Sequence, residues 1–86
     1  MWNEILLKVL DGEEDIVSPY DNAAVIQSLF VMVDIRTRMG YLWIWCSKTH
    51  KGIWISRLKI PDKVSYVKNG EIMELDVPQI HFVNPL

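Results

Sequence analysis

Cysteine is nearly absent from this sequence of 86 residues, which contains Cys46 alone. A single cysteine cannot form a disulfide within the chain, and it cannot supply the set of thiolates that a cysteine-based zinc site requires. A chain without a disulfide is typical of reducing compartments, so we expect an intracellular, cytoplasmic protein. We expect neither a bound metal nor a cofactor.

Glycine and long apolar runs are scarce as well. The four glycines lie far apart, which excludes the phosphate-binding loops of Walker and dinucleotide-binding motifs. The longest unbroken apolar run, Tyr41–Cys46, is far shorter than the roughly 20 residues that a membrane-spanning helix needs. The first residues turn acidic where a secretion signal would need small residues for cleavage. We therefore expect no membrane segment and no secretion signal.

The sequence also lacks a recognisable set of catalytic residues. Cys46 lies in a predicted strand, on the side that we assign to the core, where a thiol is buried and inert. His50 fits an exposed loop and His81 fits an edge strand, so neither is placed to act as a base. The carboxylates have no neighbouring apolar pocket that would raise a pKa toward general-acid catalysis. We expect the protein not to be an enzyme.

Apolar residues, in contrast, are abundant and make up 50% of the chain. That share is far above the low hydrophobicity of disordered segments, so we expect a folded structure along nearly the whole chain. A chain of 86 residues provides material for one hydrophobic core. We therefore predict a single domain, residues 1–86.

The N-terminal part of the chain is predicted to be helical. Apolar residues recur at helical spacing over residues 2–10, and Gly12 is suited to end that helix. Ser18, followed by proline, has the pattern of an N-cap that starts a second helix. The end of this second helix stays open, because residues 31–38 fit both a continued helix and a strand with alternating β-branched residues. The helical part therefore covers about residues 1–30 or 1–38.

The C-terminal part, about residues 41–83, is predicted to form β-hairpins. Two runs rich in aromatic and β-branched residues, Tyr41–Ser47 and Ile53–Ile60, flank a polar loop of five residues, Lys48–Gly52. A second hairpin is expected around Asn69 and Gly70, because Asn-Gly favours a type I′ turn.

The strands of this second hairpin would be residues 64–68 and 71–77, and residues 80–83 would add an edge strand. Helices before a run of strands are typical of the α+β class. We therefore predict one or two N-terminal helices packed on an antiparallel β-meander of four to six strands.

Charge is segregated along the chain, although its net value is only −2. Residues 1–35 contain seven acidic residues and one lysine, whereas residues 36–68 contain eight basic residues and one aspartate. Two interpretations stay open. Either the basic block binds an anionic partner, or the acidic N-terminal part neutralises the basic sheet within one fold or across a dimer.

The basic block also contains three of the four tryptophans. If the first hairpin is symmetric about its loop, one face is mostly apolar, with Cys46 opposite Trp54, and packs into the core. The other face brings aromatic rings beside cations, because it pairs Trp45 with Ile55, Trp43 with Arg57 and Tyr41 with Lys59. The predicted binding face consists of Tyr41, Trp43, Trp45, Arg57 and Lys59, with Arg36, Arg38, Lys48 and Lys51 as supporting basic residues.

Aromatic rings beside cations suit two kinds of partner. Trp, Tyr and Arg are frequent hot spots of protein interfaces, so the first hypothesis is a small protein-interaction module that self-associates or docks onto another protein. Bases and phosphates would fit the same face, so the alternative is a nucleic-acid-binding accessory protein that uses residues 36–68. A third interpretation is purely structural, with a helix that covers this face and buries its rings.

Overall fold

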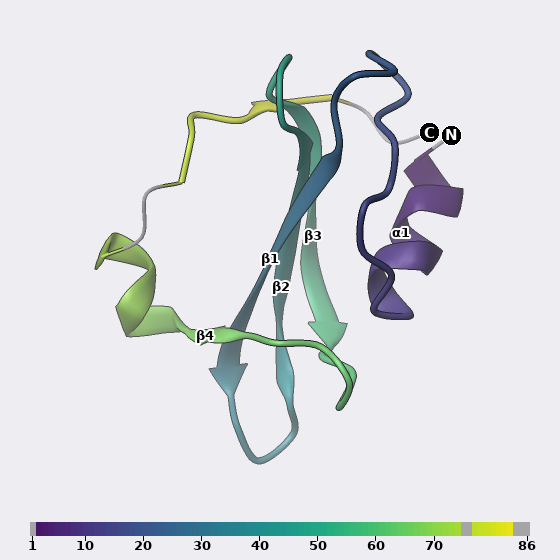
Figure 1. The fold of residues 1–86 in the computed structure, drawn as a ribbon. Coiled ribbons are helices and arrows are strands. Elements are labelled where there is room, and N and C mark those ends of the chain that lie inside the picture. Colours follow the sequence, from purple (N-terminus) through teal and green to yellow (C-terminus); the bar gives the residue numbers. More distant parts are fainter. Residues whose placement is uncertain (1, 75–76, 84–86) are drawn as a thin grey trace.

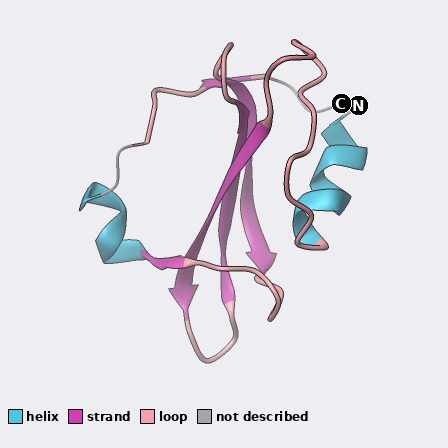
Figure 2. Cartoon of the chain, viewed as in Figure 1, coloured by secondary structure: helices cyan, strands magenta, loops and turns pink. Residues whose placement is uncertain are grey.

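The computed structural model of the protein describes residues 2–74 and 77–83 and is shown in Figure 1. Its elements are α1 (Trp2–Leu10), β1 (Ile26–Asp34), β2 (Met39–Cys46), β3 (Lys51–Lys59), β4 (Val67–Lys68), the 3-10 helix η1 (Asn69–Glu74) and β5 (His81–Phe82). The three long strands lie at the centre, with α1 on one side and η1 on the other (Figure 2).

The five strands form one sheet in the order β4-β1-β2-β3-β5. Neighbours among β1, β2 and β3 are antiparallel, whereas the short strands β4 and β5 lie parallel to β1 and β3 at the two edges. The predicted α+β class, with a helix packed on a sheet, is confirmed. The predicted all-antiparallel meander is wrong at the edges, because the chain crosses from one edge of the sheet to the other between β4 and β5 instead of turning back on itself.

The core lies between α1 and one face of the sheet. Trp2, Ile5 and Val9 form the buried stripe of α1 and pack with side chains of β1, β2 and β3. The helix ends as its sequence predicts, because Gly12 has a φ of 80° and donates its N–H to the carbonyl of Val9 at 3.0 Å. The Trp2 indole N–H donates to the Tyr20 hydroxyl at 3.2 Å, which satisfies the one polar group of this buried ring.

The predicted second helix is wrong, because Ser18 begins a closed loop instead of a helix. The Ser18 N–H donates to the carbonyl of Ala24 at 3.0 Å, and the Ser18 hydroxyl accepts the N–H of Tyr20 at 3.1 Å. Asp21 accepts the N–H of Ala23 on its side chain at 2.8 Å. Side-chain oxygens of serine and aspartate accept hydrogen bonds from backbone N–H groups in turns as well as at helix starts, so the same residues are compatible with both structures. Among the described residues 2–38, the helix covers Trp2–Leu10 alone, so neither predicted helical range, 1–30 or 1–38, is correct.

Residues 26–34 form strand β1. Of the two structures predicted for residues 31–38, a continued helix or a strand, residues 31–34 thus adopt the strand. The remaining residues, 35–38, form the turn to β2. Arg38 ends this turn with a φ of 60°, a left-handed conformation that is uncommon for a residue other than glycine.

The first predicted hairpin is confirmed as β2 and β3, but its loop is shorter and its register differs. The loop is Ser47–His50, and it ends on His50 with a φ of 58°. Trp43 lies opposite Trp54, and Trp45 lies opposite Gly52. The predicted pairing of Trp43 with Arg57 is therefore wrong, as are the other two pairs of that register and the placement of Trp54 opposite Cys46.

The reason for this register is the close approach of two backbones at Gly52. A Cβ atom at Gly52 would overlap the carbonyl oxygen of Ile44, so this glycine belongs inside β3 and not in the loop. Relative to the predicted register, this pairing moves each side chain of β3 to the opposite face of the sheet, because side chains alternate between the two faces. Ile53 is consequently buried in the core beside Ile44, and Trp54 points to the opposite face.

The predicted second hairpin is wrong. Asn69 and Gly70 begin η1, and among the described glycines only Gly12 has a positive φ, so no type I′ turn forms at Gly70. Lys68 donates its N–H to the Glu71 carboxylate at 3.0 Å, which stabilises the turn into η1. Residues 75–76 of the expected strand 71–77 lie outside the described residues. The predicted edge strand at residues 80–83 is confirmed as β5.

Candidate binding face

The side of the sheet that faces away from α1 carries most of the aromatic side chains. Leu42 and Ile44 of β2 pack into the core with α1, so their odd-numbered neighbours point to the other side. The rings on that side come from three strands, and together they are called here the tryptophan face: Tyr41, Trp43 and Trp45 of β2, Trp54 of β3 and Phe82 of β5.

Four of these rings form a continuous row. The ring centroids of Tyr41 and Trp43 lie 5.7 Å apart, those of Trp43 and Phe82 6.5 Å, and those of Trp54 and Phe82 6.4 Å. The ring planes are tilted by 43° to 60° relative to one another. These distances and tilts are those of favourable aromatic pairs, so the rings stabilise one another's positions.

Exposure increases along the face from β2 toward the β3 edge. Trp45 is buried, and its indole N–H donates to the side-chain oxygen of Gln27 on β1 at 2.8 Å. Tyr41 and Trp43 are half-buried, and the Tyr41 hydroxyl donates to the Asn69 side chain at 3.1 Å. Trp54 is 56% exposed and Phe82 is 50% exposed. Water therefore reaches mainly the two rings at the β3 edge.

That edge is only partly covered by another strand. β5 pairs with Lys51 and Gly52, and the rest of β3 has no strand partner on this side within residues 2–74 and 77–83. A register shift between β2 and β3 leaves Ser56 and Arg57 opposite Tyr41, and Lys59 pairs with Met39. Arg57 and Lys59 are both exposed. The structure thus keeps the two predicted cations on the strand that carries Trp54, but it does not pair them with Trp43 and Tyr41 as predicted.

Three of the four supporting basic residues make contacts within the fold. Arg38 donates to the carbonyl of Ile60 at 3.1 Å and lies 3.1 Å from the Asp62 carboxylate. Lys48 lies 3.8 Å from the carboxylate of Asp21. The ammonium group of Lys51 lies 5.1 Å from the ring centroid of Tyr20. Arg36, the fourth, is exposed and takes part in no ion pair in the described part of the chain.

Ion pairs connect the acidic N-terminal part to the basic block. Besides Asp21 and Lys48, the carboxylate of Asp11 accepts a hydrogen bond from the Lys63 ammonium at 2.6 Å. This hydrogen bond and the charge of Lys63 lower the pKa of Asp11. Of the two interpretations of charge segregation, these contacts favour neutralisation within one fold.

Trp54 and Phe82 are the exposed rings of the face, and the sequence prediction missed both. The sequence does contain a signal that places Trp54 on the face away from the core. The aliphatic Ile53 and Ile55 alternate with Trp54 and Ser56, and the aliphatic pair is better suited to the core. No local signal places Phe82, since its position depends on the docking of β5 beside β3.

The backbones of the three residues with catalytic potential are joined by hydrogen bonds. The His50 N–H donates to the carbonyl of Cys46 at 3.0 Å, and the His81 N–H donates to the carbonyl of His50 at 2.8 Å. Cys46 is fully buried, while His81 is exposed on β5. Burial raises the pKa of the Cys46 thiol, but hydrogen bonds from the Ser18 and Thr49 side chains and from the backbone of Thr49 and Lys48 outweigh it and lower the pKa to about 7. Within the described ranges, no three His, Cys, Asp or Glu residues lie close enough together to hold a metal ion.

The helices in the described part of the chain are all too short or too polar to cross a membrane. Comparisons with protein-family models, curated proteins and solved structures find no match for the chain.

Proposed function

We propose that the protein is a small intracellular interaction module that self-associates through the exposed end of the tryptophan face, around Trp54 and Phe82. The observation that carries this proposal is the exposure of these two rings, 56% and 50%, at the end of a row of packed aromatic side chains. Large rings held in fixed positions lose little conformational freedom on binding, and Trp is the residue most enriched among interface hot spots.

A second copy of the chain is the partner that fits this patch best. The patch is apolar and therefore self-complementary, and a twofold contact brings the same surface of both copies together. Pairing of two β3 edges is disfavoured, because Lys51, Arg57, Lys59 and the irregular register protect that edge. The contact proposed is thus ring on ring and not strand on strand.

The alternative partner, a nucleic acid, has less support. The rings of the row are tilted by 43° to 60° against one another, so they do not offer successive bases a row of parallel rings to stack on. Several basic residues of the 36–68 block are already neutralised by carboxylates: Arg38, Lys48 and Lys63. An intracellular setting remains part of the proposal because the one cysteine is a free thiol.

Sedimentation equilibrium of the parent and of Trp54→Ala tests self-association. The mass of the parent should rise with concentration toward that of a dimer. Trp54→Ala should weaken the dimer by about 2 kcal/mol or more, which corresponds to a roughly 30-fold higher dissociation constant. The reason is that Trp54 is the most exposed ring of the face and would lie at the centre of the proposed contact. The melting temperature of the dissociated chain should change little, since the ring is mostly exposed.

Ile35→Ala is the matched control, because Ile35 is 63% exposed and lies in the turn between β1 and β2. This variant should associate like the parent. A parent that stays monomeric at every concentration contradicts the proposal, and so does equal weakening by both variants. Titration of fluorescent single-stranded and double-stranded oligonucleotides at two salt concentrations separates the alternative, because phosphate contacts produce a steep salt dependence.

A further inference from the structure

The outer edge of β1 is covered at both ends and open in the middle. At its start, Val25 forms an antiparallel bridge with Val17, and the Ile26 N–H donates to the carbonyl of Ile16 at 2.7 Å. At its end, β4 pairs with Val31 and Met32. Between these covers, residues 27–30 have no strand partner on this side in the part of the chain that the structure describes.

The backbone of this open stretch is oriented to accept a strand. The Ile26 N–H points away from β2, toward Ile16, and backbone groups repeat their direction every two residues along a strand. The N–H and carbonyl of Ser28 therefore also point outward. Four residues of strand span about 13 Å, which is enough for a short extended segment to pair.

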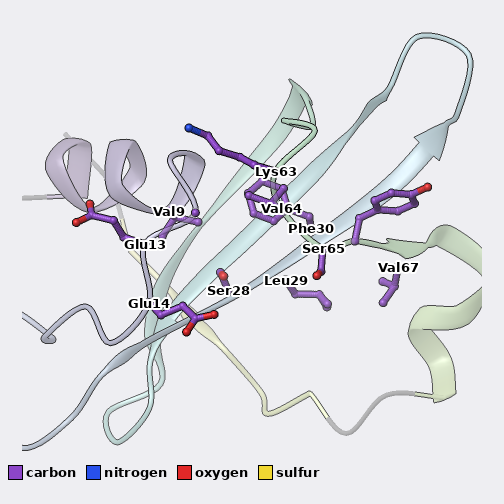
Figure 3. Close-up of a pocket in the computed structure, with 12 residues that line it drawn as sticks. Val9, Glu13, Glu14, Ser28, Leu29, Phe30, Lys63, Val64, Ser65 and Val67 are labelled. Carbon is purple, nitrogen blue, oxygen red and sulfur yellow. The ribbon is translucent and has the colours of Figure 1, made fainter.

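A pocket of about 330 Å³ lies beside this stretch. Ser28 interrupts the apolar series that Ile26, Phe30 and Met32 form on the core side of β1, and it is exposed where the other three are buried. Figure 3 shows the pocket between the end of α1 and the segment that leads to β4, with Ser28 and Leu29 on the strand between them. The position at which an apolar side chain would complete the core is thus hollow.

The lining combines apolar walls with a negative rim. Val9, Phe30 and Val64 belong to the core cluster or pack against it, and they line the pocket together with the carboxylate-bearing Glu13 and Glu14. Both glutamates are exposed, and neither takes part in an ion pair within the described residues. Lys63 also lines the pocket, but its ammonium group is bound to Asp11 at 2.6 Å. The rim therefore offers unneutralised negative charge.

We propose that the open edge of β1 binds an extended segment of a partner protein by strand addition, with a lysine or arginine side chain of that segment in the pocket. A residue opposite Ser28 in an added strand points to the same face of the sheet as Ser28, which is the face that holds the pocket. The aliphatic stem of a lysine or arginine packs along Val9 and Val64, and its charged end reaches Glu13 and Glu14 at the rim. This site is separate from the tryptophan face, and it does not depend on self-association.

Titration of the ¹⁵N-labelled protein with two capped peptides of four residues, the length of the open stretch 27–30, tests the proposal. The peptides are Thr-Lys-Thr-Val and Thr-Glu-Thr-Val, so they differ only in the second residue. The Lys peptide should shift the amide signals of Ser28, Leu29, Phe30, Glu13 and Glu14, and it should bind at least tenfold more tightly than the Glu peptide. Equal affinity of the two peptides, or shifts confined to other residues, would overturn the proposal.

Two further arms test the charge and the backbone pairing. The double variant Glu13→Gln with Glu14→Gln should raise the dissociation constant of the Lys peptide at least tenfold, whereas Glu4→Gln, an exposed control on α1, should leave it unchanged. Two Lys peptides N-methylated on opposite edges should differ at least tenfold in affinity, because an added strand pairs through only one of its edges. Equal binding of the two methylated peptides contradicts strand addition, and equal effects of the two protein variants contradict the role of the rim.

Discussion

Arg38 was predicted to support the binding face, but its contacts stabilise the fold instead. Its carbonyl accepts the N–H of Ile60 at 2.8 Å, and its guanidinium donates to the carbonyls of Ile60 at 3.1 Å and Pro61 at 3.2 Å. The same group lies 5.7 Å from the ring centroid of Tyr66. Arg38 therefore connects the turn after β1 to the end of β3 and to the segment that leads to β4.

The contacts of Arg38 predict that Arg38→Lys destabilises the protein. A lysine keeps the charge but loses the planar group that reaches two carbonyls, so the free energy of unfolding should fall by about 1–2 kcal/mol. Urea denaturation measures the change, with Arg36→Lys as the matched control in the same turn. Asp62 is 93% exposed, so Asp62→Ala should have little effect. Equal stability of parent and Arg38→Lys would show that these hydrogen bonds contribute nothing.

The buried thiol of Cys46 predicts a pH dependence of stability. Its pKa in the folded protein is about 7, below the usual value of about 8.5 for an exposed thiol. Between these two values the unfolded chain holds more protons than the folded chain, so the free energy of unfolding should rise with pH in this window. Cys46→Ala should remove that part of the rise. Parallel stability curves of parent and variant between about pH 7 and pH 9 would contradict the lowered pKa.

At the scale of the elements, Gly52 fixes the register of the first hairpin. A Cβ atom there would overlap the carbonyl oxygen of Ile44 and lie 2.8 Å from the Cβ of Trp45, whereas a Cβ atom at Gly70 meets no described atom within 4 Å. Gly52→Ala should therefore cost about 2–3 kcal/mol or more through overpacking. Gly70→Ala should leave the melting temperature nearly unchanged. Thermal unfolding of both variants checks this contrast, and similar losses at the two glycines would contradict the register.

Elements with a strong internal pattern could be predicted from the sequence. α1 follows from apolar residues at helical spacing, and β2 and β3 follow from dense aromatic and β-branched residues. Ser18 and the Asn69-Gly70 pair could not be interpreted locally, because the same short signals serve turns, helix starts and 3-10 helices. Ser18 closes a loop of its own through the hydrogen bond to Ala24, whereas the structure at Asn69 is selected by a contact distant in sequence, the pairing of β4 with β1.

At the scale of the whole molecule, the positions of the two edge strands could not be predicted from the sequence. β4 and β5 come from neighbouring parts of the chain but lie at opposite edges of the sheet, and no local pattern encodes such a crossing. The grouping of Tyr41, Trp43 and Trp45 could be predicted, because it needs only the alternation along one strand. Trp54 and Phe82 complete the face only through the register of β3 and the docking of β5.

The four tryptophans allow the central proposal, self-association through the exposed end of the tryptophan face, to be tested in one measurement. The indole N–H signals are recorded in ¹⁵N–¹H spectra over about a hundredfold range of protein concentration. The Trp54 signal should shift with concentration, and that of half-buried Trp43 should shift less. The signals of Trp2 and Trp45 should stay fixed, because these rings are buried and bound to Tyr20 and Gln27. Four signals that do not move over this range would contradict the proposal.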